Sequence, residues 1–124
     1  MPHTRSVLLV DDSKFARLLV RAFIEGNFPG WQVDEAEDAD KAQLLAAQTP
    51  YDYFVIDFNM PGMNGIELGT VLRQTYPAAR IALLTANIQQ EIQKTVAALG
   101  IDFLAKPPTQ EKITAYFKAQ ESQA

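Results

Sequence analysis

Polar residues that could act on a phosphate group stand at the ends of four short apolar runs. They are Asp11 with Asp12, Asp57, Thr85 and Lys106. Three carboxylates that met at one place would not all stay ionised without a nearby cation. The chain has no cysteine, and its single histidine is at position 3. Carboxylate oxygens are therefore the available ligands, and they favour Mg²⁺, with Mn²⁺ as a substitute.

The same residue types together indicate phosphoryl transfer onto an aspartate. An aspartate carboxylate can attack phosphorus and form an acyl phosphate. Lys106 would face phosphate oxygens as a point charge and Thr85 as a hydroxyl donor. Taken singly, each residue has a plainer interpretation, because an aspartate after a strand is commonly a turn residue or a helix cap, and Lys106 and Thr85 could be loop residues. Their shared position at strand ends favours a common site.

Five short runs rich in apolar and β-branched residues alternate with segments of helical spacing. The expected strands are Val7–Val10, Trp31–Glu35, Tyr53–Ile56, Ile81–Leu84 and Ile101–Leu104. The apolar residues between them recur at helical intervals, which predicts amphipathic helices. These residues are Phe15, Leu18, Leu19 and Phe23; Leu68, Val71 and Leu72; Ile92, Val96 and Leu99; and Ile113, Tyr116 and Phe117.

Capping residues support these boundaries. Ser13 can cap the first helix, and Thr109 the last. Asn64, followed three residues later by Glu67, is typical of a capping box. Gly100 stands where a left-handed residue would close a helix. The remaining helix, 38–48, is alanine-rich and has the weakest pattern.

The order of elements is therefore strand then helix, five times. Three of the runs are apolar almost throughout, as buried parallel strands are, whereas 31–35 alternates like an edge strand. Right-handed crossovers would place helices on both faces of the sheet. This predicts an α/β fold: a three-layer, doubly wound (βα)₅ sandwich with a parallel five-stranded sheet, whose ligands bind at the carboxyl ends of the strands.

The length, charge and hydropathy of the chain argue against several classes of protein. A chain of 124 residues fits one domain. The net charge of −4 and the lack of a basic run argue against direct nucleic-acid binding. No apolar run is long enough to span a membrane, and the first residues do not form a signal peptide. We therefore expect a soluble, cytoplasmic protein.

The chain resembles the receiver domains of two-component response regulators, especially the single-domain chemotaxis type. The resemblance rests on the stretches LLVDDS, DYFVIDFNMPGMNGIEL, IALLTAN and FLAKP, which occur in the family's order. It implies a flavodoxin-like strand order, 2-1-3-4-5. It also implies a single receiver domain over residues 1–124, with a core of about 6–119.

The resemblance also implies roles for the acidic residues. Asp57 would accept a phosphoryl group from a histidine kinase or a histidine phosphotransfer protein. Asp12 would bind Mg²⁺ directly, together with Asp57, and Asp11 largely through water. The backbone carbonyl of Asn59 would complete the metal ligands. The chain would be a signalling module rather than an enzyme, with only self-catalysed phosphotransfer and slow self-dephosphorylation.

The remaining roles concern the switch. Lys106 would pair with Asp57 and then with the phosphoryl oxygens, and Thr85 would move toward the phosphate. Phe103 would turn inward as Thr85 moves, although it could equally be an ordinary core aromatic. Phosphorylation would then alter the face made by the helix before Gly100, the strand 101–104 and the last helix, where a downstream protein binds. The Lys106–Pro107 bond resembles one that is cis in the family.

Two details set expectations for the phosphoryl lifetime and the partner contact. Asn59 and Asn87 stand two residues after Asp57 and Thr85, and both are neutral. We therefore expect that they neither strongly block nor strongly assist the water that would hydrolyse the acyl phosphate. Phe103 stands where the family commonly has tyrosine. Any contact that a tyrosine hydroxyl would make with a partner is therefore lost.

Other functions stay open at this point. The chain could be a receiver domain from a longer regulator with a DNA-binding or enzymatic output. A small aspartate-based phosphohydrolase would carry Asp-x-Asp after its first strand, whereas this chain has adjacent aspartates. An FMN carrier would need a phosphate loop there, which Asp11 and Asp12 would repel.

Overall fold

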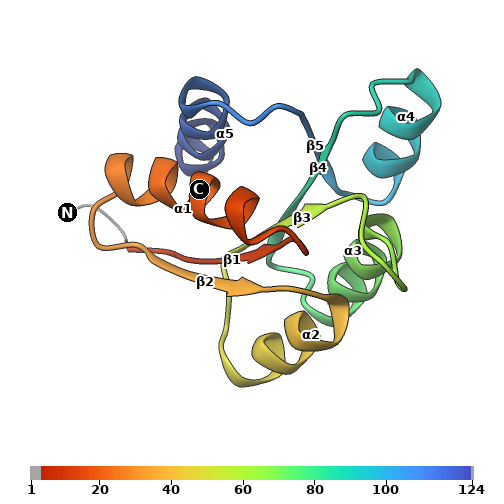
Figure 1. Cartoon of the computed structure of the whole chain (residues 1–124), viewed down its shortest axis with the longest axis horizontal. Helices are drawn as coiled ribbons and strands as arrows, with labels where there is room; N and C mark the ends of the chain where they lie inside the picture. Colours follow the sequence, from red (N-terminus) through yellow and green to blue (C-terminus); the bar gives the residue numbers. More distant parts are fainter. Residues whose placement is uncertain (1–3, 124) are drawn as a thin grey trace.

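The computed structural model describes residues 4–123, which form a parallel sheet covered by helices (Figure 1). None of the helices in this part of the chain is long and apolar enough to cross a bilayer. The elements, in order, are β1 Ser6–Val10, α1 Lys14–Asn27, β2 Gln32–Ala36, α2 Ala39–Gln48, β3 Tyr53–Asp57, α3 Gly65–Thr75, β4 Arg80–Thr85, α4 Gln90–Ala98, β5 Asp102–Ala105 and α5 Gln110–Ser122.

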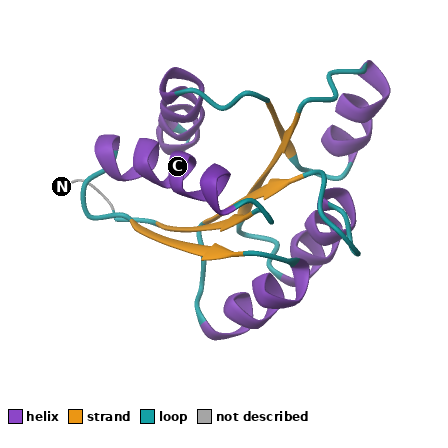
Figure 2. Cartoon of the chain, in the orientation of Figure 1, coloured by secondary structure: helices purple, strands orange, loops and turns teal. Residues whose placement is uncertain are grey.

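The five strands are parallel and lie in the order β2-β1-β3-β4-β5. Figure 2 shows helices on both sides of the sheet. Buried residues of α1 and α5 form one apolar cluster with one face of the sheet. Those of α2, α3 and α4 form the other cluster with the opposite face. The three-layer fold and its strand order are therefore confirmed.

Alternation along the strands divides the side chains between the two clusters. On β1, Leu8 belongs to the α2–α4 side and Leu9 to the α1–α5 side. All five residues of β3 are buried, whereas β2 at the sheet edge has an exposed residue, Gln32. Strands covered on both faces need apolar side chains in both directions, which explains why β1, β3 and β4 have the longest apolar runs.

The predicted caps are present. The hydroxyl of Ser13 accepts from the Ala16 N–H and that of Thr109 from the Lys112 N–H. The Asn64 side chain accepts from the backbone of Glu67, whose own side chain accepts from the Asn64 N–H, so this is a complete capping box. Gly100 follows Leu99, the C-cap of α4, and has a φ of +74°, the left-handed conformation predicted for a residue that closes a helix.

The sequence pattern predicted the wrong buried face for α1. Phe15 is 75% exposed and Leu18 is also exposed, while Val20 and Ile24 are the buried residues. Apolar residues occur on several sides of this helix, so spacing alone does not select the face that packs. Leu19 and Phe23 are only partly buried.

Two predicted strands are displaced by one residue, and the last helix is longer than expected. Trp31 precedes β2 instead of beginning it; its ring stacks on Phe28, with centroids 4.4 Å apart. Ile101 likewise precedes β5. Helix α5 continues to Ser122, past the expected core limit of 119. The ends of the expected domain, residues 1–3 and 124, lie outside the described residues.

Candidate functional site

Three carboxylates converge at the carboxyl ends of neighbouring strands. β1 and β3 pair in register, which brings the loop after Val10 beside Asp57. Asp11, Asp12 and Asp57 each offer a carboxylate oxygen, and these oxygens lie within 4.8 Å of one another. Asp57 is only 3% exposed and Asp11 8%, whereas Asp12 faces solvent. The predicted acidic set therefore forms one cluster with an open side.

Asp11 shows the electrostatic cost of this cluster. Burial raises the pKa of the Asp11 carboxyl above its ordinary value, and the nearby Asp57 and Asp12 add to the increase. The Ser13 N–H, which donates to the Asp11 carboxylate at 2.9 Å, and Lys106 act in the opposite direction. A divalent cation would offset the repulsion between these oxygens. The hard oxygen donors fit Mg²⁺.

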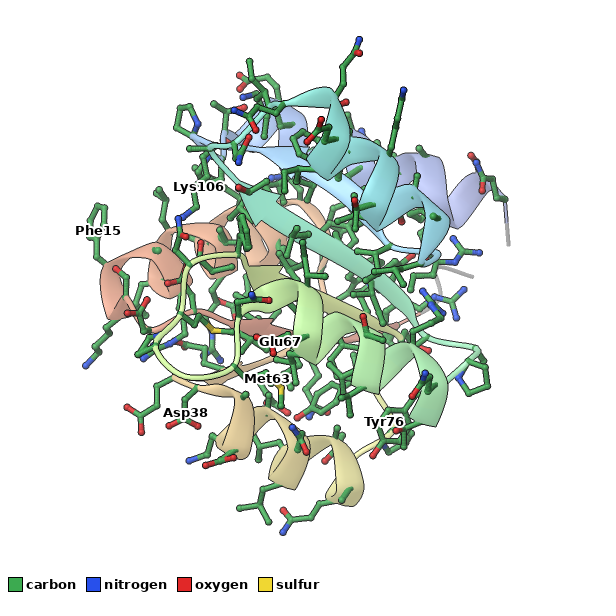
Figure 3. All side chains as sticks on the ribbon, turned by 90° about the vertical axis from the view of Figure 1, so that its right-hand side faces the viewer. Phe15, Asp38, Met63, Glu67, Tyr76 and Lys106 are labelled. Carbon is green, nitrogen blue, oxygen red and sulfur yellow. The ribbon has the colours of Figure 1, made fainter. Side chains whose placement is uncertain are left out.

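Lys106 brings a positive charge to the most buried of these carboxylates. Its ammonium group forms an ion pair with Asp57, and its backbone N–H donates to the Thr85 carbonyl at 2.9 Å. The Lys106–Pro107 peptide is cis, as the resemblance implied. Figure 3 shows Lys106 and Phe15 on the same side of the molecule.

Thr85 ends β4 as a fully buried residue. Its hydroxyl accepts a hydrogen bond from the Asn87 N–H at 3.0 Å. Phe103 is partly buried and packs against the core cluster on the α2–α4 side. It is paired with Leu83, two residues before Thr85, so Phe103 and Thr85 lie on the same face of the sheet because side chains alternate.

Asn59 lies in the loop between β3 and α3, two residues after Asp57. Its side chain is exposed. Its place beside the acidic cluster fits the implied use of its carbonyl, which stays a prediction.

Gly65, which sequence reasoning missed, sets how closely α3 approaches β3, the strand that ends in Asp57. It is the first residue of α3. A Cβ at this position would stand 2.5 Å from the Asp57 carbonyl oxygen and 2.6 Å from Leu83 Cδ1. The sequence did contain a signal for this close approach. Glycine is a weak helix former, so a glycine directly after the Asn64 cap indicates that a side chain would not fit there.

Arg17 and Glu35 were also missed. The Arg17 guanidinium donates to the Asp11 carbonyl and to the Glu35 carboxylate. Sequence alone offers no signal for this pair, because an arginine on a helix is usually solvated.

An apolar groove of about 370 Å³ adjoins the acidic cluster. It lies between the start of α1 and the loops that follow β4 and β5. Its lining includes Phe15, Leu19, Ala86, Pro107 and Pro108, with Asp11 and Lys106 beside them. The site thus combines charged groups with an exposed apolar border.

Comparisons with known proteins agree with this geometry. Residues 7–118 match the family described as response regulator receiver domain. The Chemotaxis protein CheY of Halobacterium salinarum is 34% identical over 104 residues, covering 83% of this chain and 85% of that protein. The Sensor protein EvgS of Escherichia coli (strain K12) is 36% identical over 110 residues, which are 88% of this chain but 9% of the sensor.

A solved structure shows the same fold. The chemotaxis protein CheY4 of Vibrio cholerae superimposes with a TM-score of 0.86 and 28% identity, and the match covers 94% of this chain and 98% of that one. The chain spans most of the chemotaxis relatives and a small part of the sensor. It belongs to the response regulator receiver domains of two-component signalling.

Proposed function

We propose that the chain is a phosphorylation switch that accepts a phosphoryl group on Asp57 in a magnesium-dependent reaction. The observation that carries this proposal is the convergence of Asp11, Asp12 and Asp57 within 4.8 Å, with Lys106 paired to the same Asp57. Aspartate is a nucleophile toward phosphorus in several protein classes. Membership of the receiver family supports this use of the site.

In the proposed reaction, a carboxylate oxygen of Asp57 attacks the phosphorus of a phosphohistidine. The new O–P bond forms as the P–N bond breaks, and the imidazole leaves. Asp11, Asp12, Asp57 and the Asn59 carbonyl would hold Mg²⁺. The bound ion would supply charge stabilisation for the phosphoryl oxygens. Lys106 holds the acceptor carboxylate in place before transfer and faces the phosphoryl oxygens afterwards.

The switch would follow from the exchange of one hydrogen bond for another. The Thr85 hydroxyl now accepts from the Asn87 N–H, and a phosphoryl oxygen would attract the same hydroxyl as a donor. Its movement would open space on the face shared with Phe103. Repacking there would change the surface of α4, β5 and α5, which we propose as the contact for a downstream protein.

The phosphoryl donor would be a histidine kinase or a histidine phosphotransfer protein that docks on the apolar groove. An exposed phenylalanine such as Phe15 beside the acceptor offers contact area to a protein donor. We do not propose nucleic acid as a partner, because the net charge is −4.

We further propose that residues 1–124 act as one receiver domain. All described strands lie in a single sheet, which supports one folding unit. A role within a longer regulator is the second candidate, favoured by the match to part of a much longer sensor protein.

Intact-mass analysis tests the proposed reaction. The chain is incubated with acetyl phosphate and Mg²⁺, and separately with a chelator in place of the metal. We expect a single phosphoryl adduct that requires the metal and is absent in Asp57→Asn. An adduct of equal yield in the chelator would contradict the proposal.

A further inference from the structure

Arg17 links the acidic loop to the edge strand of the sheet. It lies in the first turn of α1, just after the Ser13 cap. Its Nη1 donates to the Asp11 carbonyl at 2.6 Å, and its Nε donates to the Glu35 carboxylate at 2.9 Å. The Arg17 side chain is only 13% exposed and that of Glu35 18%. One guanidinium therefore joins two remote segments in a partly buried setting.

The carbonyl that Arg17 contacts belongs to the peptide unit between Asp11 and Asp12. A peptide unit is planar, so the direction of its carbonyl fixes the direction in which the chain reaches the next residue. The Asp11 N–H already donates to the Ala36 carbonyl at 3.1 Å, and the Asp11 carboxylate accepts from Ser13. These two bonds hold the N–H and the carboxylate of Asp11. Arg17 holds its third polar group, the backbone carbonyl.

The geometry requires an arginine rather than a lysine. A guanidinium presents several N–H donors in a rigid plane, so two of its nitrogens can serve two acceptors at fixed angles. An ammonium group on a flexible stem could not hold both acceptors in the same way.

Glu35 in turn keeps the guanidinium in place and balances its charge. One Glu35 oxygen accepts from Arg17 and the other from Arg21 Nη1 at 2.6 Å. Burial opposes ionisation, yet the two guanidinium groups hold the pKa of Glu35 below its ordinary value. Arg21 also pairs with Glu25. Two cations and two anions thus make a formally neutral network beside the acidic loop.

We propose that Arg17 is a positioning residue for the metal site: anchored by Glu35, it fixes the Asp11–Asp12 peptide and so aims both carboxylates at the cation that Asp57 shares. This inference rests on the magnesium-dependent function proposed above. Partners that orient metal ligands from the second layer commonly change metal affinity by about 10- to 100-fold when removed.

Arg21 offers a matched control, because it also bonds Glu35 but donates to no atom of Asp11 in the described hydrogen bonds. The full unphosphorylated chain is titrated with Mg²⁺ by isothermal titration calorimetry as wild type, Arg17→Lys and Arg21→Lys. We expect Arg17→Lys to weaken Mg²⁺ binding by at least about tenfold. Arg21→Lys should stay within about twofold of wild type, because Arg21 is the more exposed of the two arginines and the Arg17–Glu35 bond stays in place.

A second readout separates positioning from general loss of structure. In phosphorylation by acetyl phosphate, Arg17→Lys should raise the Mg²⁺ concentration needed for half-maximal yield and leave the yield at saturating metal near that of wild type. If Arg17→Lys does not fold, Glu35→Ala removes the anchor from the other end and should weaken Mg²⁺ binding by a similar factor.

The outcomes distinguish this inference from the proposed function. Equal Mg²⁺ affinities in Arg17→Lys and Arg21→Lys, or an unchanged affinity in Glu35→Ala, would overturn the positioning role and leave the function standing. A wild-type chain that binds no Mg²⁺ would overturn both.

Discussion

The ammonium group of Lys106 forms an ion pair with the carboxylate of Asp57, and this contact joins the ends of β5 and β3 across the intervening β4. Asp57 is almost fully buried, while the Lys106 side chain keeps 31% of its surface exposed. The lysine is therefore the positive group that stands closest to Asp57 among the described ion pairs. Its removal would leave a buried carboxylate beside two others.

Lys106→Met should lower the free energy of unfolding in the absence of metal. Because the lysine is partly exposed, we expect a loss of about 1–3 kcal/mol, the cost of leaving a buried polar group without a partner. Urea denaturation in a chelating buffer measures it. Lys118→Met, at an exposed lysine of α5, is the control and should change little. Equal losses in the two variants would contradict the role assigned to the ion pair.

Mg²⁺ should stabilise the wild-type chain, and Asp12→Asn should abolish that effect. A ligand that binds only the folded state adds about 1.4 kcal/mol at a concentration tenfold above its dissociation constant. Asp12 is the exposed member of the cluster, so its neutralisation relieves repulsion at little structural cost. Without metal, Asp12→Asn should therefore melt at or above the wild-type temperature. Thermal denaturation with Mg²⁺ and with a chelator tests both parts. A variant that is still stabilised by Mg²⁺ would contradict the first part, and a variant that melts below wild type in the chelator would contradict the second.

Gly65→Ala should disturb β3, the strand that ends in Asp57. The added Cβ would stand 2.5 Å from the Asp57 carbonyl oxygen, so backbone must move, and such overpacking costs about 1–3 kcal/mol. Phosphorylation by acetyl phosphate should slow as well, because Asp57, the proposed acceptor, is displaced.

Gly26→Ala is the matched control for this change. It is another helical glycine, and a Cβ there would meet nothing within 4 Å. Because alanine is the better helix former, we expect a gain of up to about 1 kcal/mol. Chemical denaturation of both variants gives the comparison. A stabilised Gly65→Ala chain would show that α3 does not pack closely against β3.

The far end of the sheet should give acid-sensitive stability through Glu121. Burial alone would raise the pKa of Glu121, but hydrogen bonds from Tyr53 and Arg5 hold it below its ordinary value of 4.5. A carboxyl with a lowered pKa in the folded state contributes stability that is full above the unfolded pKa and is lost as pH falls below it. Glu121→Gln should therefore be less stable than wild type by about 1 kcal/mol near neutral pH.

That difference should shrink as the pH falls from 4.5 toward about 3. Denaturation midpoints of the two chains across this range measure it. Glu37→Gln, at an exposed glutamate, should show no such convergence. A difference that grew in acid would mean that the sign of the linkage is wrong.

Much of this fold could be predicted because its signals are local. Buried parallel strands require continuous apolar runs, and β1, β3 and β4 supply them. Caps are set by side chains within three residues of the helix start, as Ser13 and Asn64 show. The acidic cluster followed from the same rule, since the carboxyl ends of parallel strands meet at one edge.

What could not be predicted depends on packing between remote segments. Phe15 and Leu18 have the spacing of a core face, yet α1 turns Val20 and Ile24 inward. The bond from Arg17 to Asp11 and the fit of Gly65 against Asp57 exist only once helix and sheet are in contact. No pattern in a single sequence encodes these distances.

Reduction of the phosphorylated chain with borohydride tests the central claim most directly. An aspartyl phosphate is an acyl phosphate, so the reagent converts the modified residue into homoserine and marks it permanently. Peptide mass spectrometry then locates the mark. We predict homoserine at position 57 only, dependent on Mg²⁺ during phosphorylation. A mark at Asp11 or Asp12 would contradict the account. So would a chain that keeps its phosphoryl group after reduction while Asp57 stays an unmodified aspartate, because the phosphoryl group would then be bound at another residue.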